Sequence, residues 1–244
     1  GLETAKRLVG EGHQVIIHGR NPEKIAAAKQ QLLATQSDGW VETCQADLSR
    51  LNEVEALAKQ LRARHSPLDV IINNAGILKM VDFTRGDEDD LDDLWRVNVK
   101  GPFRLIRAAL PHLKAAGRGR VINIASAHGL TASPFKAAYI AAKHGVVGLT
   151  KTTALETAKE DITCNAICPG YVLTPIVEKQ IPDTLKEYDM TREEVIENVM
   201  LTRQPSKEFA TVEQMGGTAT CLCSSAAAQI TGTTISVDGG WTAL

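Results

Sequence analysis

The sequence has few of the features that mark membrane, nucleic-acid-binding or secreted proteins. It contains no apolar run of about 20 residues, the length that a membrane-spanning helix needs. The 27 lysines and arginines are balanced by 29 aspartates and glutamates, so the net charge of −2 gives no indication of a nucleic-acid surface. No signal-peptide pattern is present at the start, and we therefore expect a cytoplasmic protein.

Paired cysteines are also missing. The five cysteines are odd in number and form no Cys-x-x-Cys pair, which favours small buried hydrophobic residues over linked thiols. Internal repeats and low-complexity segments are absent as well, and no metal site is predicted. What remains is the composition of an ordinary globular domain, and 244 residues suit one α/β domain spanning 1–244.

Short apolar segments alternate with helix-forming segments along the chain. This alternation predicts a Rossmann-type, doubly wound parallel sheet in a three-layer α/β/α arrangement. Asn21-Pro22 predicts a helix start, and Thr211-x-x-Gln214 predicts a capping box. The expected strands lie at 14–18, 40–46, 68–74, 120–126, 161–167 and 233–239, and a helix is expected at about 51–65.

Two segments depart from the alternation. The acidic residues 85–93 predict a solvated helix start, because carboxylates are favourable at the positive end of the helix dipole; a metal site is the alternative. Residues 173–205 form a long charged insertion between strands. Its length favours a lid over an active site rather than a simple connector.

Ser126, Tyr139 and Lys143 are the residues with the clearest chemical meaning. Tyr139 and Lys143 are four residues apart in a helix-forming segment, which places them on one face, while Ser126 ends an apolar strand. A lysine cation lowers the pKa of a nearby tyrosine, so we expect a phenol able to exchange a proton with an alcohol or a carbonyl. An ordinary helix that carries a tyrosine and a lysine is the alternative.

The motifs around this triad occur in a characteristic order: LDVIINNAG, WRVNVKG, INIAS, Tyr139-x-x-x-Lys143 and CNAICPGYVLTP. Over essentially its whole length the chain resembles the short-chain dehydrogenase/reductase family. Its second half, with IASAHGLTAS, AAKHGVVGLTK and TGTTISVDGGWTA, is similar to the bacterial D-3-hydroxybutyrate dehydrogenases within that family. The resemblance implies an NAD(P)-dependent enzyme, and a homotetramer.

The resemblance also implies roles for the catalytic residues. Tyr139 exchanges the proton of the substrate hydroxyl, and Lys143 lowers the pKa of Tyr139 and holds the nicotinamide ribose. Ser126 orients the substrate oxygen, and Asn98 anchors a water that relays the proton onward.

The start of the chain departs from the family pattern. The family has a first strand and a Gly-x-x-x-Gly-x-Gly turn that presents backbone N–H groups to the pyrophosphate. Gly1 corresponds to the last glycine of that turn. We therefore expect the natural chain to extend beyond Gly1; a genuinely shortened protein is the alternative.

The cofactor residues are likewise implied by the resemblance. Arg20, at the end of the 14–18 strand, stands where an acidic residue would bind the ribose hydroxyls of NAD, and a guanidinium suits the 2′-phosphate of NADP. The hydroxybutyrate dehydrogenases use NAD, so NAD is expected and NADP is the alternative. The remaining predicted contacts are Gly1, Asp47, Leu48, Asn74, Ala75, Gly76, Tyr139, Lys143, Pro169, Gly170, Val172 and Thr174.

A small carboxylate substrate is implied beside Tyr139. His128, Lys136 and Gln180 match the positions that bind the carboxylate of hydroxybutyrate; separately, each has an ordinary surface or loop explanation. Leu78 replaces a family glutamine that also contacts the carboxylate. We expect this loss of a donor to weaken carboxylate binding or to admit a bulkier, less polar substrate.

Three functions follow from these residues. The first is reversible, NAD-dependent oxidation of (R)-3-hydroxybutyrate, a 3-hydroxy acid, to acetoacetate, a 3-oxo acid. The second is NADPH-dependent reduction of a 3-oxoacyl group or another carbonyl, which Arg20 and Leu78 favour. The third is a non-catalytic dinucleotide-binding protein, which the presence of Asn98, Ser126, Tyr139 and Lys143 disfavours.

Overall fold

The computed structural model describes residues 1–35, 39–64 and 68–244, without the side chains of Ile176, Lys179, Gln180, Asp183 and Glu187. Strands and helices alternate in the first half of the chain. The elements are α1 (Leu2–Gly10), β1 (Val15–Gly19), α2 (Pro22–Leu33), β2 (Val41–Gln45), α3 (Leu51–Arg64), β3 (Val70–Asn73), α4 (Glu88–Trp95), a π-helical segment (Arg96–Lys100) and α5 (Gly101–Ala115).

The second half continues the alternation and adds a helical insertion after β5. Its elements are β4 (Gly119–Ile124), α6 (Ala137–Thr157), β5 (Ile162–Pro169), α7 (Pro175–Tyr188), α8 (Arg192–Glu194), a π-helical segment (Val195–Met200), α9 (Val212–Cys223) and β6 (Thr234–Val237). Short 3-10 helices lie at Ala127–Gly129, Ser225–Ala227 and Trp241–Ala243. The predicted strand boundaries are confirmed within two residues, and residue 65 of the predicted helix lies outside the described residues.

All strand pairs are parallel, as the alternation predicts, but they form two sheets instead of one. One sheet pairs β1 with β2, and the other has the order β3-β4-β5-β6. Within the described ranges no strand lies between β1 and β3, which is where the family places its first strand. The expectation of one continuous sheet therefore needs this correction.

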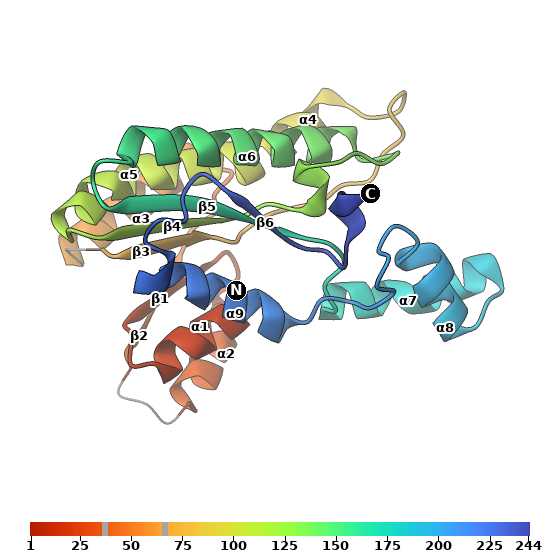
Figure 1. Ribbon diagram of the computed structural model, residues 1–244, viewed down its shortest axis with the longest axis horizontal. Coiled ribbons are helices and arrows are strands. Elements are labelled where there is room, and N and C mark those ends of the chain that lie inside the picture. The colour runs from red at the N-terminus through yellow and green to blue at the C-terminus, as the bar shows by residue number, and fades with distance from the viewer. Residues whose placement is uncertain (36–38, 65–67) are drawn as a thin grey trace.

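Helices cover both faces of the four-stranded sheet. Figure 1 shows α5 and α6 along one face and α9, with α1 beside it, along the other, while α7 and α8 project beyond the end of β5. Neighbouring residues of β4 point to opposite layers, since the side chains of a strand alternate. Val121 packs with α5 and α6, and Ile122 packs with α9, which confirms the predicted three-layer arrangement.

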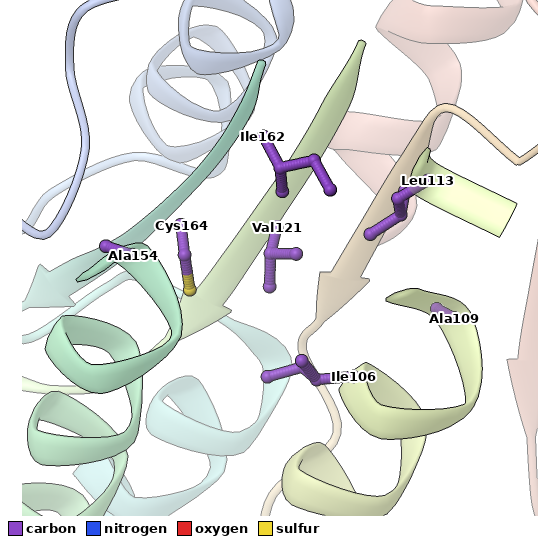
Figure 2. Close-up of a cluster of buried hydrophobic side chains, with 7 residues drawn as sticks. All are labelled: Ile106, Ala109, Leu113, Val121, Ala154, Ile162 and Cys164. Atoms are coloured by element: carbon purple, nitrogen blue, oxygen red, sulfur yellow. The ribbon is translucent and has the colours of Figure 1, made fainter. Parts of the chain in front are cut away.

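The core between the sheet and α5 is a cluster of aliphatic side chains around Val121 (Figure 2). Leu113 and Val121 are fully buried, and Ile162 of β5 is almost so. Cys164, in the same cluster, and Cys44 and Cys168 are also buried, so these three cysteines act as small apolar residues, as predicted. Among the described helices, none is long and apolar enough to cross a membrane.

The predicted helix starts are confirmed by their caps. The Asn21 side chain accepts a hydrogen bond from Lys24 N at 2.8 Å, with Pro22 as the first helical residue. Thr211 and Gln214 form a reciprocal capping box at α9. These side chains satisfy backbone N–H groups that have no partner within the helix.

The acidic segment forms the start of α4. The Asp87 side chain accepts from Asp90 N at 2.8 Å, so the carboxylates stand at the positive end of the helix dipole, as predicted. Asp90 pairs with Lys79, and Asp92 pairs with Arg96. These carboxylates therefore have protein partners.

We expect Leu113→Ala to lower the free energy of unfolding by about 2–5 kcal/mol, because it removes a fully buried side chain and leaves a cavity. Urea unfolding measures this change. Leu155→Ala is the control, since Leu155 is 80% exposed on α6, and it should change stability by about 0.5 kcal/mol or less. Equal losses in the two variants would contradict the assigned core.

Candidate active site

The carboxyl ends of β3, β4 and β5 meet at one edge of the sheet, because these strands are parallel and adjacent. Ligands of open α/β sheets bind at this edge. The segments that follow the three strands carry most of the predicted site residues. They are Asn74–Gly76 after β3, Ser126 after β4, and Gly170–Thr174 after β5.

The structure brings the predicted triad together. Ser126 has extended backbone dihedrals and immediately precedes the 3-10 helix at Ala127–Gly129. Its hydroxyl accepts a hydrogen bond from His128 N at 3.1 Å. That hydroxyl lies close enough to the Tyr139 phenol to act on its pKa. Lys143 Nζ lies 5.6 Å from the Tyr139 ring centroid and donates to Ile124 O at 2.9 Å.

The electrostatics of this triad differ from the expectation. Burial raises the pKa of Tyr139, and the nearby Ser126 hydroxyl offsets only part of that rise. Burial also lowers the pKa of Lys143 to about 8, so the lysine carries less than a full charge near neutral pH. Lys143 is not among the causes of this shift, so a lowering of the Tyr139 pKa by Lys143 stays a prediction.

Asn98 fixes the loop that follows β3. It lies in the π-helical segment, is 2% exposed, and accepts from Ile77 N at 3.0 Å while donating to Ile77 O at 2.9 Å. A Cβ on Gly76 would lie 2.9 Å from Asn98 Oδ1 and 3.7 Å from Lys143 Nζ. A side chain at 76 would therefore force Asn98 to move, and the loop lies close to Lys143 of the triad.

His128 lies beside Tyr139, as the substrate prediction requires. Its ring makes edge contacts with Tyr139 at 6.0 Å and with Trp241 at 5.0 Å, and its Nε2 lies 2.8 Å from Ser133 Oγ. Burial, with the positive charges of Lys136 and Arg203, lowers the pKa of His128 to about 4. The imidazole is therefore neutral at physiological pH and can bind an oxygen only as a neutral donor.

Lys136 supplies a charge near His128. It precedes α6 and is half-buried, and burial followed by repulsion from Arg203 lowers its pKa. Gln180 lies on α7, and its side chain is outside the described part of the structure. Leu78 is 48% exposed in the loop after β3, and the adjacent Lys79 pairs with Asp90 of α4 instead of replacing the missing donor.

The residues predicted to bind adenosine are separated from the triad and lie near β1 and β2. Arg20 Nη1 is 3.9 Å from Asp47 Oδ2. Burial alone would raise the pKa of Asp47, but the hydrogen bonds from Ser49 and the charges of Arg20 and Arg50 lower it. Leu48 is buried against Gly101 at the start of α5.

The remaining cofactor predictions line the strand ends. Gly1 lies against the Asn74 amide, since a Cβ there would be 2.8 Å from Asn74 Nδ2. Asn74, Ala75 and Gly76 are exposed, and Thr174 caps α7. After Pro169, a Cβ on Gly170 would lie 2.5 Å from Gln204 Oε1, and Val172 bridges to Ala210. These segments lie along one edge of the sheet and expose backbone groups there, which suits the binding of an extended dinucleotide.

Sequence reasoning missed three residues near the site. Trp241 is 7% exposed and stacks on Tyr171, with 6.1 Å between the ring centroids. Its only signal in the sequence was that it is an aromatic residue in the C-terminal segment. Ser133 is the partner of His128. Arg203, whose Nη1 donates to Ala132 O at 2.7 Å, gave no sequence signal because it is distant along the chain.

Comparison with known proteins identifies the family to which the chain belongs. Residues 1–185 match the short chain dehydrogenase family model, and the chain belongs to this family of oxidoreductases, which use a nicotinamide dinucleotide. It is 46% identical to a D-beta-hydroxybutyrate dehydrogenase of Rhizobium meliloti (strain 1021), over the whole chain and 94% of the relative. A protein of the same name from Cupriavidus necator is 39% identical over the whole chain and 93% of its own length.

A solved structure shows the same fold. Actinorhodin polyketide ketoreductase with NADPH has a TM-score of 0.89 and 31% identity, covering the whole chain and 93% of that protein.

We expect wild-type stability to rise with pH between about 8 and 10, relative to Lys143→Met. In this window the unfolded lysine binds a proton that native Lys143, with its pKa of about 8, has released. The gain should be about 2 kcal/mol by pH 10. Urea unfolding at pH 7, 8, 9 and 10 measures it, and identical pH slopes for the two proteins would contradict the buried, shifted lysine.

Proposed function

We propose that this protein catalyses reversible, NAD-dependent oxidation of (R)-3-hydroxybutyrate to acetoacetate. The observation that carries the proposal is the adjacent Ser126–Tyr139 pair beside a neutral His128 and the Lys136 ammonium. The first pair suits an alcohol or carbonyl oxygen, and the second suits a carboxylate. The relatives named D-beta-hydroxybutyrate dehydrogenase support this substrate.

Each residue has one task in this reaction. Tyr139 accepts the hydroxyl proton during oxidation and donates it to the carbonyl oxygen during reduction. Ser126 binds the same oxygen. The Lys143 ammonium is held in place by its hydrogen bond to Ile124 O, and its remaining N–H donors bind the nicotinamide ribose. The nicotinamide supplies the hydride-accepting or hydride-donating chemistry when it is bound.

Lys136 and His128 bind the other end of the substrate. A 3-hydroxy acid is small and flexible, so a charged group that binds its carboxylate is needed to orient its hydroxyl at Tyr139. Lys136 supplies the charge, and a neutral His128 supplies a hydrogen bond without competing for a proton. We assign Gln180 of α7 to the same carboxylate, and residues 173–205 to a lid that closes on it.

The raised pKa of Tyr139 has a directional consequence. The phenol is protonated at neutral pH and suits donation to acetoacetate. Oxidation requires the rarer base form, so its rate should increase with pH over the neutral and mildly alkaline range. A homotetramer completes the proposal, by resemblance to the family.

We expect Tyr139→Phe to reduce kcat for 3-hydroxybutyrate oxidation by at least about 100-fold, because the acid–base group is removed. Cofactor binding should change little, since the ring stays in place. Steady-state kinetics measures the first effect and fluorescence titration with NADH the second. Substantial residual turnover would remove Tyr139 from its assigned role.

The second candidate is an NADPH-dependent carbonyl reductase, and Arg20 is the observation that favours it. Its guanidinium is largely exposed at the end of β1 and can meet a 2′-phosphate. Asp47, 3.9 Å away, partly neutralises that charge and disfavours an added phosphate. This pairing supports NAD as the preferred cofactor.

We expect wild type to use NAD in preference to NADP. Arg20→Gln should reduce kcat/KM for NADP by about 10-fold or more and that for NAD by less than about threefold, because charge-assisted contacts to a phosphate are lost only with NADP. Initial rates with both cofactors decide this. A wild-type preference for NADP would support the reductase instead.

A further inference from the structure

A cavity that the candidate active site does not use lies between α3 and α5. The two helices pack side by side (Figure 1), with Leu105 of α5 against Val54 and Leu57 of α3. Beside this contact the helices enclose a volume of about 400 Å³. None of the described residues that line this cavity has a role in the candidate active site.

Positive charge is concentrated in the cavity. Its described lining has four cationic side chains and one carboxylate: Lys59, Arg62, Arg104 and Arg107 against Glu55. The chain as a whole, by contrast, has a net charge of −2. Within the described ranges no ion pair joins any of the four cations to a carboxylate. The cations therefore repel one another, and an anion bound between them would relieve that repulsion.

The Arg104 guanidinium is partly removed from water. Its Nη1 atom is enclosed by protein and has no hydrogen-bond partner among the described residues. A guanidinium keeps its charge at physiological pH, so loss of a proton cannot remove the cost of this burial. Because the same side chain lines the cavity, an anion bound there would compensate the charge that burial leaves unpaired.

Two further arginines of the lining are exposed, and each has a contact that restricts its position. Arg62 Nε donates to Ala58 O at 3.3 Å, and its Nη atoms make no hydrogen bond within the described part of the chain. The Arg107 guanidinium carbon lies 5.8 Å from the centroid of the Phe103 ring. Arginine presents a planar fork of N–H donors, which matches the oxygens of a phosphate group.

The rest of the lining suits an organic group. Leu51, Val54, Ala58 and Ala108 provide apolar surface among the basic side chains. The volume is in the range that small-molecule ligands occupy. A recess between two helices also favours a small ligand over a macromolecule, since Arg104 is half-buried and faces the inside of the recess.

We propose that the cavity between α3 and α5 binds a phosphate group, either as the free ion or as a monoester of a small organic molecule. Arg104 and Arg107 bind the phosphate oxygens, Arg62 and Lys59 add positive charge, and the apolar lining receives the organic part. This site is separate from the dinucleotide site at the sheet edge. The inference does not rest on the proposed function.

Calorimetric titration of the protein saturated with NADH tests the site, because the cofactor then blocks the dinucleotide site to other phosphates. We expect inorganic phosphate and phenyl phosphate each to bind with a Kd of about 1 mM or lower. Tighter binding of phenyl phosphate would identify an organic monoester as the ligand, and equal binding would identify the free ion; both results support the site. A Kd above about 10 mM for both probes would overturn it.

Arg104→Gln tests the residue, because it removes the half-buried charge and keeps a polar side chain. We expect this variant to bind both probes at least about tenfold more weakly, since charge-assisted hydrogen bonds are lost. Arg118→Gln is the matched control: it removes the same charge from a side chain that is 67% exposed outside the cavity, and it should bind as wild type does. An equal loss in the two variants would show general attraction of anions and would overturn the site.

Arg107→Gln keeps the proposal testable if Arg104→Gln does not fold. Arg107 is exposed, so the fold should be retained, and binding should weaken by about fivefold or more. Unchanged binding in this variant would overturn the site. Sedimentation velocity on the same samples detects a different occupant. Failure of wild type to bind either probe, together with self-association that Arg107→Gln abolishes, would show that a second copy covers the cavity, and would refute the site.

Discussion

The burial of the Lys143 ammonium is the constraint on which the site depends. A cation that is 6% exposed must have a partner, and this one finds the carbonyl of Ile124 at the end of β4. That single bond ties α6 to the sheet edge and sets the rotation of the helix. Because Tyr139 is one turn earlier on α6, the same rotation carries the phenol to Ser126.

A second set of buried hydrogen bonds, inside the core, supports this arrangement. Asn73 donates to Asn123 Oδ1 at 2.7 Å, and Asn123 donates to Thr150 Oγ1 at 2.9 Å. These bonds connect β3, β4 and α6 inside the core. Asn73 Oδ1 is buried without a partner among the described residues, but the bonds that Asn123 makes with Asn73 and Thr150 still resist sliding of the layers, since a shift would break them. The strand ends that carry Asn74 and Ser126 are therefore held in fixed register.

The sequence was sufficient to predict the elements that local rules determine. Caps such as Asn21 and Thr211, and the four-residue spacing of Tyr139 and Lys143, depend on neighbours along the chain and were predicted correctly. The pKa of Tyr139 was not, because burial is a property of the assembled layers. Arg203 was missed for the same reason, and the division into two sheets depends on long-range pairing that periodicity does not encode.

The contact between His128 and Ser133 has a consequence for substrate recognition. A neutral imidazole has two tautomers, and the hydroxyl at Nε2 can serve as donor for one and acceptor for the other. A bound carboxylate needs a donor and selects the tautomer whose Nδ1 carries the proton, so the Ser133 hydroxyl must then donate to Nε2. A bound carboxylate would therefore fix the position of a hydrogen that either tautomer of the empty site allows.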